Sequence, residues 1–106
     1  NGVYATVTVD DGKLYYGMTN VGYNPTVNGK RKTVETNLFG FDKVIYGETI
    51  LTFFFKWLRD EHKFPSVEAL RDQLAVDTVS ASKYFESDEY KYWKENFERE
   101  YKTVEK

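Results

Sequence analysis

The segment VYATVTVDDGK, residues 3–13, decides the fold of the first half of the chain. Its valine and alanine residues alternate with tyrosine and threonine, a period-2 pattern that is typical of a β-strand with one face in a core. The turn-forming residues Asp10-Asp11-Gly12-Lys13 follow, and Asp-Gly is a strong hairpin signal. Residues 14–21 are therefore expected to form the returning strand of a hairpin.

Two further strands are predicted downstream of this hairpin, at residues 33–39 and 48–58, where β-branched and aromatic residues are frequent. Residues 22–26 (GYNPT) and the Asn28-Gly29 pair have loop chemistry. Residues 40–47 are expected to connect the last two strands. Four short strands with turn-rich links are typical of a small antiparallel barrel or sheet.

The spacing of the apolar residues becomes helical after Pro65. Ser66 is the expected N-cap of a first helix, and a second helix is expected to begin at residues 87–89. Strands followed by helices predict a mainly β, α+β domain. Residues 1–86 would form the barrel and the first helix, and residues 87–106 an amphipathic helix packed on the same domain. The apolar positions are Val67, Leu70, Leu74, Ala81 and Phe85 in the first helix and Tyr90, Trp93, Phe97, Tyr101 and Val104 in the second.

The composition of the 106 residues fits one small globular domain. Hydrophobic residues make up 41% of the chain and aromatic residues 18%. A disordered chain would contain fewer residues of both kinds. The formal net charge of -2 gives no electrostatic reason to expect a nucleic-acid or anionic-membrane partner. The apolar run at residues 50–58 is too short for a membrane-spanning helix, and no signal peptide is recognisable.

Two residue types restrict the chemistry of the chain. It has no cysteine, which excludes disulfides, thiolate metal sites and cysteine nucleophiles and suits a reducing cytoplasm. Its single histidine, His62, excludes a metal site built from several histidines. The sequence also contains no Gly-x-x-x-x-Gly-Lys-Ser/Thr motif, so the chain is not a P-loop kinase.

Several short motifs occur in a characteristic order across residues 2–85. GYNPT at 22–26 precedes the glutamate-bearing strand TVETNLF at 33–39, and FD at 41–42 and IYG at 45–47 come next. LRDEHKF at 58–64, SVEAL at 66–70, Gln73-Leu74 and Asp77 complete the set. In this order, the motifs resemble the riboflavin kinase family, whose members phosphorylate riboflavin to FMN.

The resemblance implies a six-stranded Greek-key β-barrel with a C-terminal helix. It also implies riboflavin as the acceptor, with ATP as co-substrate and Mg²⁺ as the metal. In bacteria this module is usually the C-terminal part of a bifunctional FAD synthetase, so an adenylyltransferase domain is expected in the parent protein.

One expected motif of the family lies upstream of Gly2-Val3-Tyr4. This Pro-Thr-Ala-Asn motif helps to hold Mg²⁺ and the nucleotide phosphates, and Pro25-Thr26 is a different, downstream pair. We therefore expect the chain to lack the first strand or strands of the barrel and to hold no metal ligand. Alone, it would be weak or inactive as a kinase. The open sheet edge would favour a homodimer.

Glu35 is the catalytic residue that the resemblance implies. A carboxylate within hydrogen-bond reach of a ribityl hydroxyl can accept its proton or orient it. Asn37 projects from the same strand face, where the family usually has His, and is a candidate substrate contact. By pattern alone, an exposed Glu and a surface amide on the solvent face of a sheet are the alternatives.

Gly22, Asn24 and Arg59 are candidate contacts for the nucleotide phosphates. Glycine lets a backbone approach a ligand closely, and the planar guanidinium of arginine can bind a phosphate with two hydrogen bonds. The alternative is an ordinary loop between strands at residues 22–26.

Residues 59–64 match a loop that covers the flavin in the family. This match makes Asp60, His62 and Lys63 candidate flavin contacts, whereas a solvated charged loop is the alternative.

Three functions therefore compete: a riboflavin kinase domain, a non-catalytic flavin- or nucleotide-binding module, and a protein-interaction domain. The apolar stripe of the second helix is open to three interpretations as well. It can pack on the sheet, cover the flavin ring or bind a partner helix.

Overall fold

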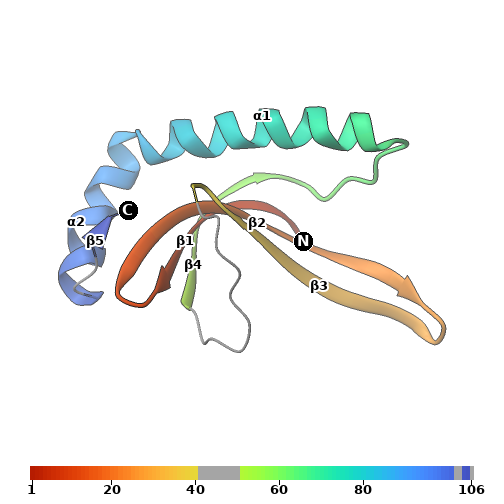
Figure 1. Cartoon of the computed structure of the whole chain (residues 1–106), viewed down its shortest axis with the longest axis horizontal. Helices are drawn as coiled ribbons and strands as arrows, with labels where there is room; N and C mark the ends of the chain where they lie inside the picture. Colours follow the sequence, from red (N-terminus) through yellow and green to blue (C-terminus); the bar gives the residue numbers. More distant parts are fainter. Residues whose placement is uncertain (41–50, 102–103, 106) are drawn as a thin grey trace.

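The computed structural model describes residues 1–40, 51–101 and 104–105, in which two helices cover one face of an antiparallel sheet (Figure 1). The predicted connection at residues 40–47 and the predicted strand start at residues 48–50 lie almost entirely outside the described residues. The elements are β1 (Gly2–Asp10), β2 (Lys13–Thr26), β3 (Gly29–Leu38), β4 (Leu51–Arg59), α1 (Val67–Phe85), α2 (Asp88–Tyr101) and β5 (Val104–Glu105).

The strands follow the order β3-β2-β1-β4, and β5 pairs with the start of β2 in parallel. Three strands follow one another as a meander and β4 returns to lie beside β1, which is the order of a Greek key. The predicted α+β class, with strands first and helices after, is confirmed. Within the described residues the barrel is an open sheet, because β3 and β4 stand at opposite ends of the strand order.

The first hairpin forms as its sequence predicts. Asp10 pairs with Lys13, and the two residues between them have positive φ angles, 52° for Asp11 and 73° for Gly12. These angles are typical of the type I′ turn that joins twisted antiparallel strands.

The second hairpin corrects the sequence prediction. β2 continues through the predicted loop at residues 22–26 as far as Thr26, and β3 begins at Gly29 instead of residue 33. Tyr23 pairs with Lys32 inside this region. The backbone pairing between β2 and β3 on either side of the short turn therefore overrides the loop preference of Gly, Asn and Pro at residues 22–26. Figure 1 shows this hairpin projecting away from the helices.

The core lies between the sheet and the C-terminal half of α1 together with α2. Val7 and Leu14 of the sheet are fully buried there with Tyr90, and Phe97 is buried beside them. Burial of these side chains is the main favourable contribution to folding. The N-terminal half of α1 is different, since Val67, Leu70 and Leu74 remain partly exposed above the sheet.

Threonines hold the strands together on the opposite face of the sheet. The hydroxyl oxygens of Thr6 and Thr19 are 3.0 Å apart, and those of Thr19 and Thr36 are 2.8 Å apart. A third hydroxyl pair, Thr8–Thr52 at 3.0 Å, joins β1 to β4. Because buried hydroxyls need partners, these bonds fix the register of all four strands.

No helix formed by the described residues is long and apolar enough to cross a membrane.

Candidate functional site

A groove runs between the N-terminal half of α1 and the sheet. It consists of two cavities of about 470 and 250 Å³ that share Asn20, Leu70 and Leu74 in their walls. Two leucines of α1 form its apolar side, and strand side chains form the other. An apolar cavity of this size with a few polar groups is typical of a small-molecule site.

The smaller cavity contains the two site residues predicted on β3. Glu35 pairs with Asn20 and Asn37 with Met18, so these four side chains lie on the same face of the sheet, toward α1. All four residues line the smaller cavity. Glu35 and Asn37 are exposed, so a ligand in the groove can reach the carboxylate and the amide.

The larger cavity contains three of the residues predicted at the end of β4 and in the segment that follows it. Arg59, His62 and Lys63 line it with Phe64, and the rings of His62 and Phe64 lie 4.8 Å apart at 74°. Asp60 is exposed and does not line this cavity. The two cavities adjoin at Asn20, Leu70 and Leu74, so Glu35 and Asn37 of the smaller cavity lie in the same groove as His62, Lys63 and Arg59 of the larger one.

Two side chains attach this segment to the backbone of β2. The Tyr23 amide donates to Glu61 Oε2 at 3.2 Å, and Lys63 Nζ donates to the Tyr23 carbonyl at 3.2 Å. The β1–β2 ladder ends at Val21, and among the described residues these side chains contact the β2 backbone beyond that point.

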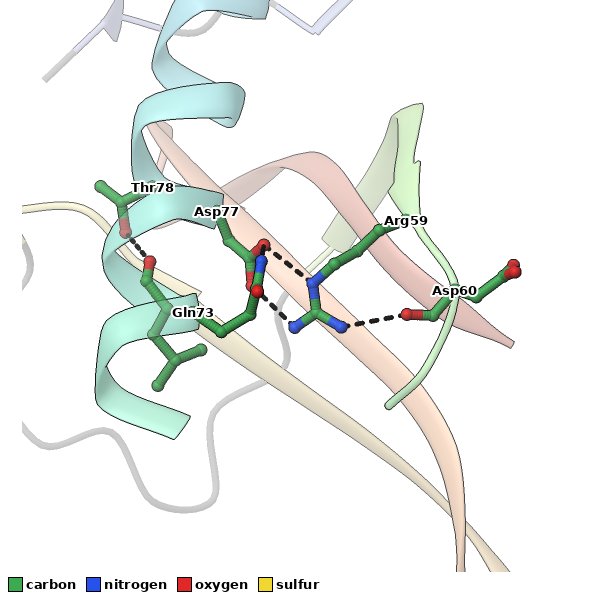
Figure 2. A network of polar contacts seen from close by, with 6 residues as sticks. Arg59, Asp60, Gln73, Asp77 and Thr78 are labelled. Atoms are coloured by element: carbon green, nitrogen blue, oxygen red, sulfur yellow. Dashed lines mark hydrogen bonds and ion pairs between the residues drawn. The ribbon is translucent and has the colours of Figure 1, made fainter. Parts of the chain in front are cut away.

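Arg59 binds Asp77 of α1 through two parallel hydrogen bonds (Figure 2). Its Nε donates to Oδ1 at 2.8 Å and its Nη2 donates to Oδ2 at 2.7 Å. Its Nη1 donates to the Asp60 carbonyl at 3.0 Å. Three of the five N–H groups of the guanidinium are thus bound within the chain, and its phosphate contact remains a prediction.

Of the other two predicted phosphate contacts, Gly22 lines neither cavity. It is buried, and a side chain added there would overlap the Glu61 carboxylate. The backbone of Asn24 pairs with Arg31 in the β2–β3 ladder. The phosphate contacts of Gly22, Asn24 and Arg59 stay predictions.

Among the described residues, no group of three His, Cys, Asp or Glu side chains lies close enough to hold a metal ion. One ionisable group outside the groove is perturbed, because burial and then the Glu89 carboxylate raise the pKa of Tyr84 above 10.0.

The three residues that line both cavities, Asn20, Leu70 and Leu74, were not predicted as ligand contacts. The two leucines belong to a helical stripe that suggested core packing. Asn20 carried a signal, since it is the first polar residue after Leu14, Tyr16 and Met18 on one strand face. A polar residue that interrupts an apolar face marks the place where the core ends and a cavity can begin.

The family model described as riboflavin kinase matches residues 1–85 of the chain. The chain belongs to the riboflavin kinase family. It is 38% identical over 87 residues to the bifunctional riboflavin kinase/FMN adenylyltransferase of Bacillus subtilis, a match that covers 79% of this chain and 28% of that relative. The same enzyme of Haemophilus influenzae is also 38% identical, over 81% of this chain and 28% of the relative.

Another relative in this family is the RNA-binding riboflavin kinase RibR of Bacillus subtilis. It is 37% identical over 81% of this chain and 38% of its own length. Our expectation that the chain has no nucleic-acid partner therefore stays untested. The chain spans between 28% and 38% of the length of these three relatives.

The chain is also similar to a solved structure. This structure is described as a macrolide-efflux protein from Streptococcus pneumoniae, and it matches with a TM-score of 0.71 and 36% identity. The match covers 77% of this chain and 27% of the other. It supports the mainly β fold with C-terminal helices described above.

Proposed function

We propose that this chain is the flavin-binding part of a riboflavin kinase that transfers a phosphoryl group from ATP to a ribityl hydroxyl of riboflavin, giving FMN. The observation that carries the proposal is the wall that the two cavities share, Asn20, Leu70 and Leu74. It joins Glu35 and Asn37 at one end to His62, Lys63 and Arg59 at the other, and all five were predicted from the family motifs.

The shape and polarity of the groove suit riboflavin, which has a planar apolar ring and a polyhydroxylated chain. Leu70 and Leu74 offer an apolar wall for the ring, and His62 and Lys63 offer polar groups at its edge. The hydroxyl chain would lie along β3, where Asn37 can exchange hydrogen bonds with it.

Glu35 would act on the hydroxyl that attacks the phosphorus atom. Its carboxylate accepts the proton of that hydroxyl as the new P–O bond forms and the bond to the ADP leaving group breaks. The exposed position of Glu35 on the groove wall leaves room for the hydroxyl on one side and for ATP on the other. Asn37, two residues along the same face, would orient the hydroxyl.

The test compares Glu35→Gln with Glu95→Gln, which removes an exposed carboxylate of α2 outside the groove. In a longer protein that carries this module, Glu35→Gln should lower kcat about 10²- to 10⁴-fold, the usual contribution of a general base. Glu95→Gln should leave kcat unchanged. Undiminished activity of the Glu35→Gln protein would remove the catalytic role from this residue.

The isolated chain tests the binding half of the proposal. Titration with riboflavin, followed by flavin fluorescence with and without MgADP, should show binding that Glu35→Gln preserves. No binding to a folded chain would show that the groove is incomplete as a flavin site.

A non-catalytic flavin-binding module is the second candidate. The hydrogen bonds of Arg59 to Asp77 and Asp60 and the burial of Gly22 favour it, because groups of the chain itself occupy two of the three predicted phosphate contacts. Turnover of ATP with riboflavin by the isolated chain, at the rate of the longer protein, would rule it out.

The relatives suggest the setting of the module. Two of them are named as bifunctional with an FMN adenylyltransferase, and we place such a domain in the parent protein. Mg²⁺ is expected to enter with ATP, with protein ligands outside the described residues. The lack of cysteine favours the cytoplasm. We also propose that the chain forms a homodimer through an open edge of its sheet.

A further inference from the structure

Helix α1 is attached to the sheet unevenly along its length. Its C-terminal half is fixed by Ala81 and Tyr84, which are buried in the core. Its N-terminal half overhangs the groove, where the exposed fractions of Leu70 and Leu74 are 40% and 38%. Asp77 lies between these two parts of the helix, so the position of the overhanging half depends on what holds Asp77.

The side chain of Asp77 is 3% exposed and that of Arg59 is 21% exposed. Arg59 is the last residue of β4 and itself lines the groove. Gln73, one turn earlier on α1, donates from Nε2 to Asp77 Oδ1 at 2.9 Å and braces the carboxylate (Figure 2). A planar pair with two short hydrogen bonds fixes both distance and orientation, which a single ion contact does not.

The same arginine also holds the segment that leads away from β4. Its Nη1 binds the Asp60 carbonyl, and its guanidinium carbon lies 5.7 Å from the centre of the Phe64 ring. Glu61 and Lys63 then bind the Tyr23 backbone, as described above. The segment at residues 59–64 is therefore fixed to α1 at one end and to β2 at the other.

We propose that Arg59 and Asp77 form a positioning latch that sets the spacing between α1 and the sheet at the width that riboflavin requires. The latch rests on the proposed flavin site. It adds two residues that affect riboflavin binding only through the side chains that they position. Neither residue reacts with riboflavin. Arg59 and Asp77 hold Leu70 and Leu74 opposite the strand side chains, and a binding site needs such fixed walls to recognise a rigid ring.

The test uses Asp77→Asn, which removes the charge but keeps the size of the side chain. Arg59→Lys is the second variant, because it keeps the charge and removes the planar pair of donors. The matched control is Glu89→Gln. Glu89 pairs with Lys56 at 3.8 Å and so also joins β4 to a helix, but outside the groove and with both side chains about half exposed.

Two measurements are made on each folded variant. Because the chain has no cysteine, Glu68→Cys on α1 and Lys32→Cys on β3 can carry spin labels whose separation reports the spacing of helix and sheet. Asp77→Asn should broaden this distance distribution and raise the riboflavin Kd at least about tenfold. Arg59→Lys should act in the same direction, and Glu89→Gln should change neither quantity. Circular dichroism identifies any variant that does not fold.

Each outcome decides between the latch and its alternatives. An unchanged distance distribution in folded Asp77→Asn overturns the latch. A broadened distribution with an unchanged riboflavin Kd overturns its role in binding. If the unmodified folded chain binds no riboflavin, the binding half of the proposed function fails, and the label distances alone still decide whether the pair sets the spacing.

Discussion

At Gly22, the Glu61 carboxylate fills the space that a side chain would occupy. The sequence suggested that this glycine lets a ligand approach the backbone. In the structure the approaching group belongs to the chain itself, and it accepts a hydrogen bond from the Tyr23 amide. The predicted approach of a ligand to Gly22 stays a prediction, because the group found there depends on a contact between residues far apart in sequence.

This contact predicts the effect of Gly22→Ala. The added methyl group displaces the flexible Glu61 side chain and breaks its bond to Tyr23, so the free energy of unfolding should fall by about 1 kcal/mol. In a Glu61→Ala background, where the bond is already absent, Gly22→Ala should cost much less. Urea unfolding of the four proteins measures the coupling, and equal costs in both backgrounds would contradict it.

The sequence predicts some of the residues of the groove but not the contacts between them. Glu35, Asn37, His62 and Lys63 were found because the family motifs mark them. The ion pair of Arg59 with Asp77 was not foreseen, although both residues were noted. Arginine can bind a phosphate or a carboxylate with the same geometry, and only the fold decides which one lies in reach.

Elements were predicted best where the signal is local. The Ser66 hydroxyl accepts from the Ala69 amide at 3.1 Å, which confirms the predicted N-cap of α1. Asp11-Gly12 predicts the first hairpin, whereas the second, with Val27 and Asn28 between its strands, lies where the sequence predicts a loop. In the second hairpin, the pairing of the flanking residues decides the structure.

Helix α2 allows a comparison between two aromatic residues of one stripe. Tyr90 is fully buried and contacts the rings of Tyr16, Phe55 and Phe85, whereas Trp93 is 52% exposed. Tyr90→Ala should therefore lower the free energy of unfolding by about 3 kcal/mol or more, since it empties a core position. Trp93→Ala should cost less than about 1 kcal/mol.

Urea unfolding of the two variants tests whether α2 is part of the core. Similar costs at both positions would show that α2 packs differently from the structure. A large loss of stability in Tyr90→Ala with a small loss in Trp93→Ala would mean that the core does not need Trp93. Trp93 would then be available to cover the flavin ring or to bind a partner helix.

At the scale of the whole molecule, the two outer strands of the sheet differ in their resistance to pairing. β3 carries the exposed basic residues Lys30, Arg31 and Lys32, and charges on an edge strand oppose association with another sheet. β4 instead exposes the apolar side chains of Leu51, Phe54 and Trp57, with Lys56 as its one charged residue before Arg59. The predicted dimer should therefore form through β4 and not through β3.

This difference gives a test with a matched pair of variants. Phe54→Lys adds a charge to β4 and should raise the dimer Kd at least about tenfold, because two lysines per edge would then repel a second copy. Val34→Lys adds the same charge at an exposed position of β3 and should leave association unchanged. Sedimentation over a range of concentrations measures both. A chain that stays monomeric at the highest concentration excludes the dimer, and an equal loss of association in Val34→Lys would move the interface away from β4.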